Sequence, residues 1–167
     1  LDIAPDCDNL QIVAVGNGTG SSTSVPTNGW YNYSISEQIF TASEIGQAGT
    51  IKSLSFYCTS NGYINRDFTV YLAHTSKSSF SSATDWVTVS TSDVVYSGNC
   101  YIASGEWNTI TFTTPFEYNG TDNLVVIIDD NTGDYVSQAS FRTHTADGNK
   151  TLYFNNDNTN VNPTASS

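Results

Sequence analysis

Turn-forming residue pairs recur along this chain and limit its fold more than any other feature of the sequence. They separate short apolar runs, and they are Asn17-Gly18, Asn28-Gly29, Asn61-Gly62, Ser97-Gly98, Asn119-Gly120 and Asp147-Gly148. Pairs of this kind favour tight turns, and runs of a few apolar residues between turns are typical of strands rather than helices. The spacing therefore predicts an all-β protein, either a sandwich or a barrel.

The apolar runs predict where the strands lie. Aromatic residues make up 13% of the chain, and Ser and Thr are abundant, which favours strands further. We predict strands at residues 10–15, 30–40, 50–59, 66–75, 86–90, 94–96, 107–113, 124–129, 140–145 and 151–155. So many strands in one domain predict a two-sheet antiparallel β-sandwich with jelly-roll or Greek-key connections. Residues 42–47 are the one predicted helix, with Thr41 or Ser43 as N-cap and Glu44 in its first turn.

A chain of 167 residues fits one domain with a substantial core. We assign residues 1–155 to a single β-sandwich domain and residues 156–167 to a polar C-terminal tail. The tail ends in Pro-Thr-Ala-Ser-Ser, which is typical of a linker to a following module. Because the sequence contains no methionine, we expect it to be a processed or excised part of a longer protein.

The charge of the chain narrows the range of partners. The formal net charge is −11, and Lys and Arg together number five. Binding to nucleic acid or to an anionic membrane surface requires clustered cations, so neither partner is expected. No apolar run approaches the roughly 18 residues that a membrane helix needs. Neutral ligands, cations and basic proteins remain as partners.

Three cysteines occur, Cys7, Cys58 and Cys100, without the spacing of a metal site. Two arrangements remain open. A single bridge between Cys58 and Cys100 is slightly favoured over three unpaired, buried thiols.

The faces of the predicted strands separate core aromatics from outward aromatics. Because side chains alternate across a strand, the residues at i±2 share a face with residue i. This sorting places aromatic rings on the polar side of several strands: Trp30, Tyr57, Tyr71, Trp86 and Tyr153. Trp107 also falls on a polar face, but it opens a strand and is expected to pack under an adjoining turn.

Outward aromatic rings beside hydroxyl and amide groups suit carbohydrate, because the apolar faces of sugar rings stack on flat aromatics while sugar hydroxyls bond to polar neighbours. The alternative is that these rings cover cross-strand neighbours or form a second layer under a loop. For any single ring the second interpretation is favoured. For the set as a whole, the two are about equally supported.

The densest acidic cluster follows the most apolar predicted strand. Its oxygen-bearing side chains suggest Asp129, Asp130 and Asp134 as ligands of a structural Ca²⁺ ion. A solvated turn is somewhat better supported, because the spacing does not match an EF-hand loop. Asp130, Asn131 and Tyr135 are also candidate sugar contacts.

Catalytic patterns are weak in this sequence. There is no Gly-x-Ser-x-Gly motif, and no cysteine stands near a plausible histidine partner. A glycoside hydrolase needs two carboxyl groups across a cleft, and no acidic pair stands out by its sequence context. We therefore predict a protein that is not an enzyme.

Several segments resemble accessory jelly-roll modules of multimodular secreted Bacteroidetes proteins. The resemblance rests on segments between Trp30 and Gly133: Tyr33-Ser34-Ile35-Ser36-Glu37-Gln38-Ile39-Phe40, Gly49-Thr50-Ile51-Lys52-Ser53-Leu54-Ser55-Phe56-Tyr57, Val70-Tyr71-Leu72-Ala73-His74-Thr75, Phe80 through Asp85-Trp86, Gly105-x-Trp107-x-x-Ile110, Pro115-Phe116-x-Tyr118-x-Gly120, and Asn123-Leu124-Val125 through Asp129-Asp130-Asn131-Thr132-Gly133. It implies a jelly roll, an extracellular or cell-surface location, and an adhesin-like or carbohydrate-binding role. It provides no ligand residues that transfer position by position.

Together these observations predict a non-catalytic carbohydrate-binding module of a secreted bacterial protein, which binds a neutral polysaccharide or other glycan alongside further modules of the same parent chain. The candidate ligand-binding residues are Trp30, Tyr57, Tyr71, Trp86, Asp130, Asn131, Tyr135 and Tyr153. The alternatives are a protein-binding adhesin or a structural spacer domain and, with less support, a glycoside hydrolase.

Overall fold

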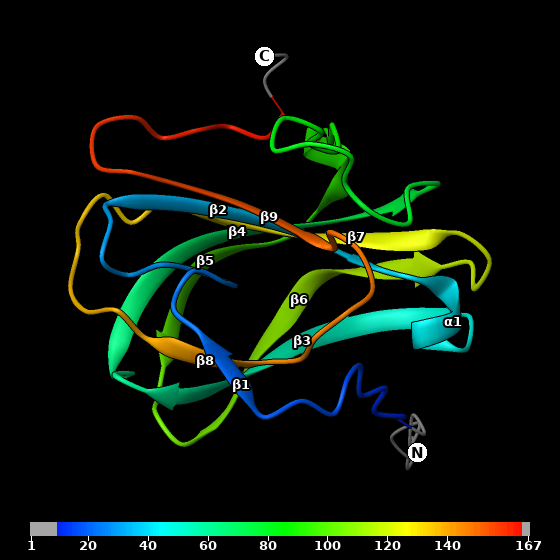
Figure 1. The fold of residues 1–167 in the computed structure, drawn as a ribbon, viewed down its shortest axis with the longest axis horizontal. Helices are drawn as coiled ribbons and strands as arrows, with labels where there is room; N and C mark the ends of the chain where they lie inside the picture. Colours follow the sequence, from blue (N-terminus) through cyan, green and yellow to red (C-terminus); the bar gives the residue numbers. More distant parts are fainter. Residues whose placement is uncertain (1–9, 165–167) are drawn as a thin grey trace, which may run out of the picture.

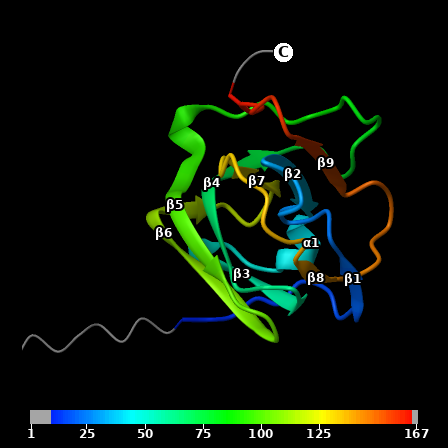
Figure 2. The same ribbon diagram turned by 90° about the vertical axis from the view of Figure 1, so that its left-hand side faces the viewer.

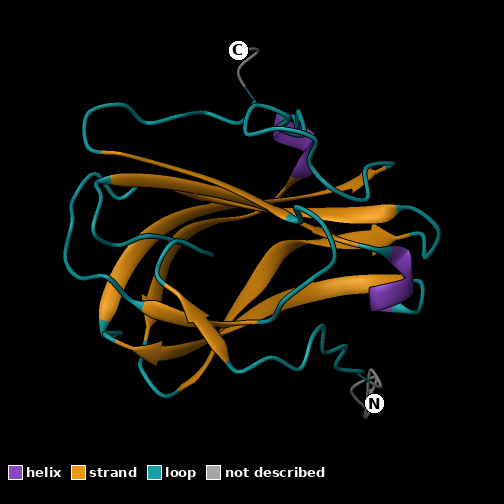
Figure 3. Ribbon diagram, in the orientation of Figure 1, coloured by secondary structure: helices purple, strands orange, loops and turns teal. Residues whose placement is uncertain are grey.

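The computed structural model describes residues 10–164, which form nine strands, one short α-helix and one 3-10 turn (Figures 1 and 3). The helix α1 is Ala42–Ile45, and the 3-10 turn η1 is Thr91–Asp93. The strands are β1 (Gly20–Ser22), β2 (Tyr33–Phe40), β3 (Gly49–Ser60), β4 (Ile64–Thr75), β5 (Val94–Ile102), β6 (Glu106–Tyr118), β7 (Asn123–Asp130), β8 (Ser140–Thr143) and β9 (Thr151–Asn156).

The strands build two antiparallel sheets that pack face to face (Figures 1 and 2). The four-stranded sheet has the order β1-β8-β3-β6, and the five-stranded sheet has the order β5-β4-β7-β2-β9. β1 pairs with β8, β2 with β7, β3 with β6 and β4 with β5, which is the pairing of a jelly roll. β9 extends the second sheet beside β2. The predicted β-sandwich is confirmed.

The inner core lies between the sheets and follows from the alternation of apolar residues. On β4, Phe68, Val70 and Leu72 are nearly inaccessible to solvent and face the interior, as their spacing predicts. Ile110 and Phe112 of β6 lie in the same cluster. Burial of these side chains is the main source of stability, at roughly 1.5–3 kcal/mol for each fully buried apolar side chain.

An outer core covers the opposite face of the five-stranded sheet. β7 is apolar on both faces, so that Val126 and Ile128 join the inner core whereas Val125 and Ile127 join the outer one. The outer core is closed by residues 76–93, which connect β4 to β5 and bury Phe80 to 2% exposure. A strand that is buried on both faces has a continuous run of apolar residues, and β7 has such a run.

Some predicted strands differ from the observed ones. Residues 10–15 and 86–90 lie outside any strand, β1 was not predicted, and β5 and β6 extend beyond their predicted ends. Gly98, predicted to lie in a turn, is inside β5 opposite Phe68 of β4. In residues 86–90, the backbone N–H of Val87 donates to Glu37 Oε2 at 2.8 Å instead of to a neighbouring strand.

The predicted helix is confirmed at Ala42–Ile45. Thr41 is its N-cap, and Glu44 Oε2 accepts hydrogen bonds from the backbone N–H and the hydroxyl of Thr41, both at 2.7 Å. Gly46 ends the helix with φ at 79°, a left-handed conformation that glycine adopts without strain. No helix in residues 10–164 is both long and apolar enough to cross a bilayer.

Cys58 and Cys100 are both free thiols, so the slightly favoured bridge between them is not formed. Cys58 lies on β3 of the four-stranded sheet and Cys100 on β5 of the five-stranded sheet. The Cys58 thiol is fully buried and donates to the carbonyl of Ser60. Cys7 lies outside the described residues.

The first part of the predicted tail contacts the domain. The backbone N–H of Asn32 donates to Asp157 Oδ1 at 3.1 Å, and Asn160 Nδ2 donates to Asn131 Oδ1 at 2.6 Å. The segment after β9 thus packs beside the loop that follows β7.

Candidate functional site

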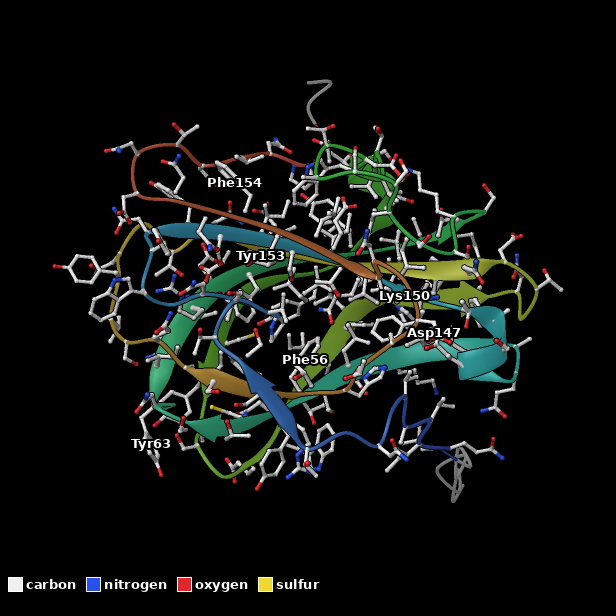
Figure 4. All side chains as sticks on the ribbon, viewed as in Figure 1. Phe56, Tyr63, Asp147, Lys150, Tyr153 and Phe154 are labelled. Atoms are coloured by element: carbon white, nitrogen blue, oxygen red, sulfur yellow. The ribbon has the colours of Figure 1, made fainter. Side chains whose placement is uncertain are left out.

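Four connections lie together at one end of the sandwich, on the left in Figure 1 and towards the viewer in Figure 2. They are residues 23–32, 61–63, 103–105 and 131–139, which leave β1, β3, β5 and β7. Exposed aromatic side chains gather in these connections and at the adjoining strand ends: Trp30, Tyr63, Tyr101, Trp107 and Tyr135. We call this region the aromatic end. Figure 4 shows Tyr63 projecting from it.

A buried ion pair lies directly beneath the aromatic end. Arg66 of β4 places Nε 2.7 Å from Asp130 Oδ2, and both side chains are completely inaccessible to solvent. The Asp130 carboxylate also accepts hydrogen bonds from the hydroxyl of Thr27 at 2.5 Å and from that of Thr132 at 2.6 Å. A buried ion pair is tolerated when its hydrogen bonds are satisfied, as they are here. Asp130, predicted as a ligand residue, therefore has a positioning role in this structure.

The same guanidinium group holds two loops in place. Arg66 Nη1 donates to the carbonyl of Asp134 at 2.7 Å, and Nη2 donates to the carbonyl of Tyr31 at 3.0 Å. Asp134 lies in the loop after β7, and Tyr31 lies in the loop before β2. Because each carbonyl belongs to a residue next to an exposed aromatic, Arg66 fixes the backbone beside Trp30 and beside Tyr135.

Trp30 and Tyr135 form an exposed aromatic pair at the tip of these loops. Their ring centroids are 6.3 Å apart, and their planes meet at 50°. Trp30 is 57% exposed and Tyr135 is 60% exposed. A backbone hydrogen bond of 3.0 Å from Val136 to Gly29 joins the two loops beside the pair. Here the loops approach so closely that a side chain at Gly29 would clash with the backbone. The sequence predicted both rings as ligand residues, and the fold brings them together.

The turn with Tyr63 adjoins the loop after β7. Ser137 Oγ donates to the carbonyl of Asn61 at 3.0 Å, and Asn61 Nδ2 donates to the carbonyl of Gln138 at 3.3 Å. Tyr63 is 68% exposed, with φ at 69°. Sequence sorting missed Tyr63 because it lies in a turn, where alternation assigns no face. Its position directly after Asn61-Gly62 was the signal available in the sequence.

A second aromatic pair lies on the outer face of the four-stranded sheet. Tyr57 of β3 and Trp107 of β6 are cross-strand partners with ring centroids 5.6 Å apart, in an edge-to-face arrangement. The Arg142 guanidinium carbon lies 4.1 Å from the centroid of the Tyr57 ring. Arg142 thus occupies one face of Tyr57, while Trp107 remains exposed rather than packed under a turn as predicted.

Tyr71 and Trp86 lie away from the aromatic end. Tyr71 lies on the face of β4 that the alternation predicts, but residues 76–93 cover that face and leave the ring 6% exposed. Trp86 packs half-buried against the same outer core. Both rings were predicted to face solvent, and neither does so freely. Alternation assigns a side chain to one face of a strand, but it does not show what covers that face.

Tyr153 lies on β9, the edge strand of the five-stranded sheet (Figure 4). It pairs with Ser36, whose side chain points inward, whereas its neighbours Leu152 and Phe154 lie on the outer face. Alternation places Leu152 and Phe154 opposite Tyr153, as observed, but their apolar face is the outer face of the sheet and not the inner one. Tyr153 is still exposed, because β9 lies at the sheet edge, and it is separate from the loops of the aromatic end.

The three proposed calcium ligands have different surroundings. Asp129 and Asp130 are consecutive residues of β7, so their side chains point to opposite faces of the sheet. Asp134 supplies its backbone carbonyl to Arg66. Asn131, the first residue of the loop after β7, donates from its side-chain amide to the carbonyl of Asp129 at 3.1 Å. Within residues 10–164, no cluster of three or more His, Cys, Asp or Glu side chains could hold a metal ion. The calcium site stays a prediction.

Two carboxyl groups are buried under the outer core. Desolvation raises the pKa of Glu37 to about 7, although its bond to the Val87 N–H lowers it, and desolvation likewise raises the pKa of Asp129 to about 7. Glu37 lies opposite Ile127, two residues from Asp129, so both carboxyls share one face of the sheet. Their exposures of 1% and 5% leave no room for a polysaccharide between them in this structure.

Comparisons of this chain with protein-family models, with curated proteins and with solved structures gave no match.

Proposed function

We propose that this chain is a non-catalytic carbohydrate-binding module of a multimodular extracellular protein, and that it binds a neutral polysaccharide at the aromatic end. The observation that carries the proposal is the Trp30–Tyr135 pair, which combines two exposed rings with a fixed backbone. Single exposed hydrophobic side chains are common on protein surfaces, whereas adjoining ones often mark an interaction site.

Sugar recognition at this pair would combine stacking with hydrogen bonds. The rings of Trp30 and Tyr135 present flat apolar faces to the apolar side of a pyranose. The exposed Asp134 carboxylate beside Tyr135 is an acceptor for sugar hydroxyls. The net charge of −11 disfavours acidic polysaccharides, so the ligand class is neutral.

Affinity electrophoresis against a panel of soluble neutral polysaccharides tests this proposal. We expect one or more polysaccharides to retard the wild-type protein, and the retardation to be lost in Trp30→Ala and strongly reduced in Tyr135→Ala. Loss of a stacking ring removes a large part of the contact area, which corresponds to about tenfold or more in affinity.

Tyr153→Ala is the matched control for Tyr135→Ala, because Tyr153 is 54% exposed but lies on the edge strand β9. It should bind like the wild-type protein. The proposal fails if no neutral polysaccharide retards the wild-type protein, or if all three variants bind as strongly as it does.

A protein-binding adhesin or structural spacer is a second candidate function. It is favoured by Val136, which is 55% exposed beside Tyr135, because an aliphatic side chain suits a protein interface better than a sugar. Failure of all glycans to bind, together with capture of a defined protein through Trp30 and Tyr135, would support it.

A glycoside hydrolase has less support, because Glu37 and Asp129 are covered. Release of reducing sugar from the same polysaccharide panel would reveal such activity.

Binding of a structural calcium ion is proposed separately from sugar binding. Melting with and without a chelator answers it, since a metal that binds only the folded state raises the melting temperature.

The proposed secretion, the Bacteroidetes-like module family and the attachment to further modules rest on the sequence resemblance between Trp30 and Gly133. The jelly-roll strand pairing supports that resemblance at the level of fold.

A further inference from the structure

A cavity of about 300 Å³ opens between the two sheets, beside β5 and β6. Its apolar wall combines side chains from both sheets and from the loop before β2: Pro26, Phe56, Phe68, Ile102, Ile110 and Phe141. Phe56 is labelled in Figure 4. Protein interiors are close-packed and hold few voids larger than a water molecule. A volume of this size lies at the lower end of the roughly 300–1,000 Å³ of ligand pockets.

Polar residues of β5 and β6 also line the cavity, and those of β6 are Asn108, Thr109 and Thr111. On β5, Tyr96, Asn99 and Cys100 line it, and the Tyr96 hydroxyl donates to the carbonyl of Asn99 at 2.9 Å. Exposed Tyr101 is a further lining residue, so the cavity reaches from the inner core to the surface.

The charges near the cavity disfavour an anionic ligand. Asp67 of β4 lies opposite Asn99 in the strand register and is exposed. Burial is the main cause that raises the pKa of Cys100, and the Asp67 carboxylate raises it further. None of the five Lys and Arg residues lines the cavity, so a carboxylate or phosphate group on a ligand would find no cation there in a chain of net charge −11.

We propose that this cavity is a binding site for a neutral, mainly apolar small molecule, such as one with an aromatic ring or a short aliphatic chain and a single hydrogen-bonding group. The apolar part lies against Phe56, Phe68 and Ile110, and the polar group lies towards Tyr96 and Cys100. The site is independent of the Trp30–Tyr135 pair, and its ligand is not a polysaccharide.

Indole serves as the neutral probe, and benzoate serves as the anionic one. Melting temperature is measured against probe concentration, and alkylation of Cys100 by iodoacetamide at pH 9 is followed by peptide mass spectrometry. We expect indole to raise the melting temperature and to slow Cys100 alkylation several-fold, because an occupied cavity blocks the thiol. Benzoate should do neither. No effect of indole on either measurement, or an equal effect of benzoate, would overturn the proposal.

Ile110→Trp fills the cavity and keeps Cys100 as a reporter. Indole should no longer protect Cys100 in this variant, whereas polysaccharide retardation should persist as evidence of a folded domain. If Ile110→Trp does not fold, Cys100→Phe fills the cavity from β5 and is tested by melting temperature alone. Trp30→Ala is the matched control, which should keep the full indole response. A filled variant that responds to indole like the wild-type protein would contradict the assignment.

Discussion

At Arg66, a single guanidinium group meets a buried carboxylate and the carbonyls of two loops. Arginine suits this position because its planar, permanently charged group offers several donors in fixed directions. The arrangement links stability to the proposed function, because the guanidinium group that pairs with Asp130 also holds the backbone beside Trp30 and Tyr135. Lysine could satisfy the carboxylate but not both loop carbonyls.

Arg66→Met should destabilise the domain by about 3–5 kcal/mol, because it leaves the Asp130 carboxylate buried without its cation. Urea denaturation measures this change. Arg142→Met is the matched control and should cost less than about 1 kcal/mol, because the Arg142 guanidinium lies over Tyr57 on the exposed face of the sheet. Equal losses in the two variants would show that the Arg66 ion pair contributes no more to the free energy of unfolding than an exposed arginine does.

The sequence predicted which face of a strand a side chain occupies better than it predicted whether solvent reaches that side chain. Alternation placed Phe68, Val70 and Leu72 inside and Tyr71 on the opposite face, and the structure agrees. It could not show that Tyr71 is covered, since the covering residues belong to another part of the chain. Arg66 gave no signal either, because nothing local distinguishes a buried arginine from an exposed one on a strand.

Among the elements, the segment 76–93 has the largest effect on the sequence-predicted site, because it covers the part of the sheet face that carries Tyr71. Its residues 86–90 alternate as a strand would, yet the backbone N–H of Val87 bonds to the Glu37 side chain. Periodicity reports that one side of a segment is buried, and it does not identify the partner. The Trp30–Tyr135 pair was unpredictable as a pair for a similar reason, since it depends on how the loops before β2 and after β7 meet.

Phe80→Ala tests whether this segment is part of the cooperative fold. Phe80 is 2% exposed in the outer core, so we expect a loss of about 3–5 kcal/mol in the free energy of unfolding. Phe154→Ala, at 43% exposure on the same sheet face, should cost clearly less. Urea denaturation measures both. A small loss for Phe80→Ala would mean that the segment opens independently of the sandwich.

At the scale of the whole molecule, carboxyl groups with raised pKa values and carboxyl groups with lowered pKa values make stability depend on pH in opposite ways. The raised pKa values of Glu37 and Asp129 mean that the folded state binds more protons than the unfolded state between about pH 4 and 7. Stability therefore falls as pH rises through this window and is level above it. Hydrogen bonds lower the pKa values of Glu44 and Asp85, although desolvation is the largest single influence on Glu44 and raises its pKa. The stability contributed by these two groups is lost only at lower pH.

We accordingly predict that the domain is more stable near pH 5 than near pH 8. Glu37→Gln should remove roughly 2–3 kcal/mol of this difference, because most of the free energy of raising one pKa from 4.5 to about 7 is lost between pH 5 and pH 8. The amide oxygen can still accept the bond from Val87. Denaturation curves from pH 4 to 8 in 0.5 M salt measure the effect while screening the general repulsion of a chain with net charge −11. A wild-type profile that is flat or rises with pH would contradict the burial of these carboxyls.

The jelly-roll pairing also has a consequence for how the chain reaches its native state. β4 and β5 are neighbours in sequence, whereas β2 must find β7 and β1 must find β8 across most of the domain. Each such closure costs loop entropy before it gains contacts, so domains with this wiring fold on the slow scale of milliseconds to seconds. Arg66 and Asp130 lie on β4 and β7, so the aromatic end acquires its geometry only after β4 has paired with β7 across the intervening strands β5 and β6.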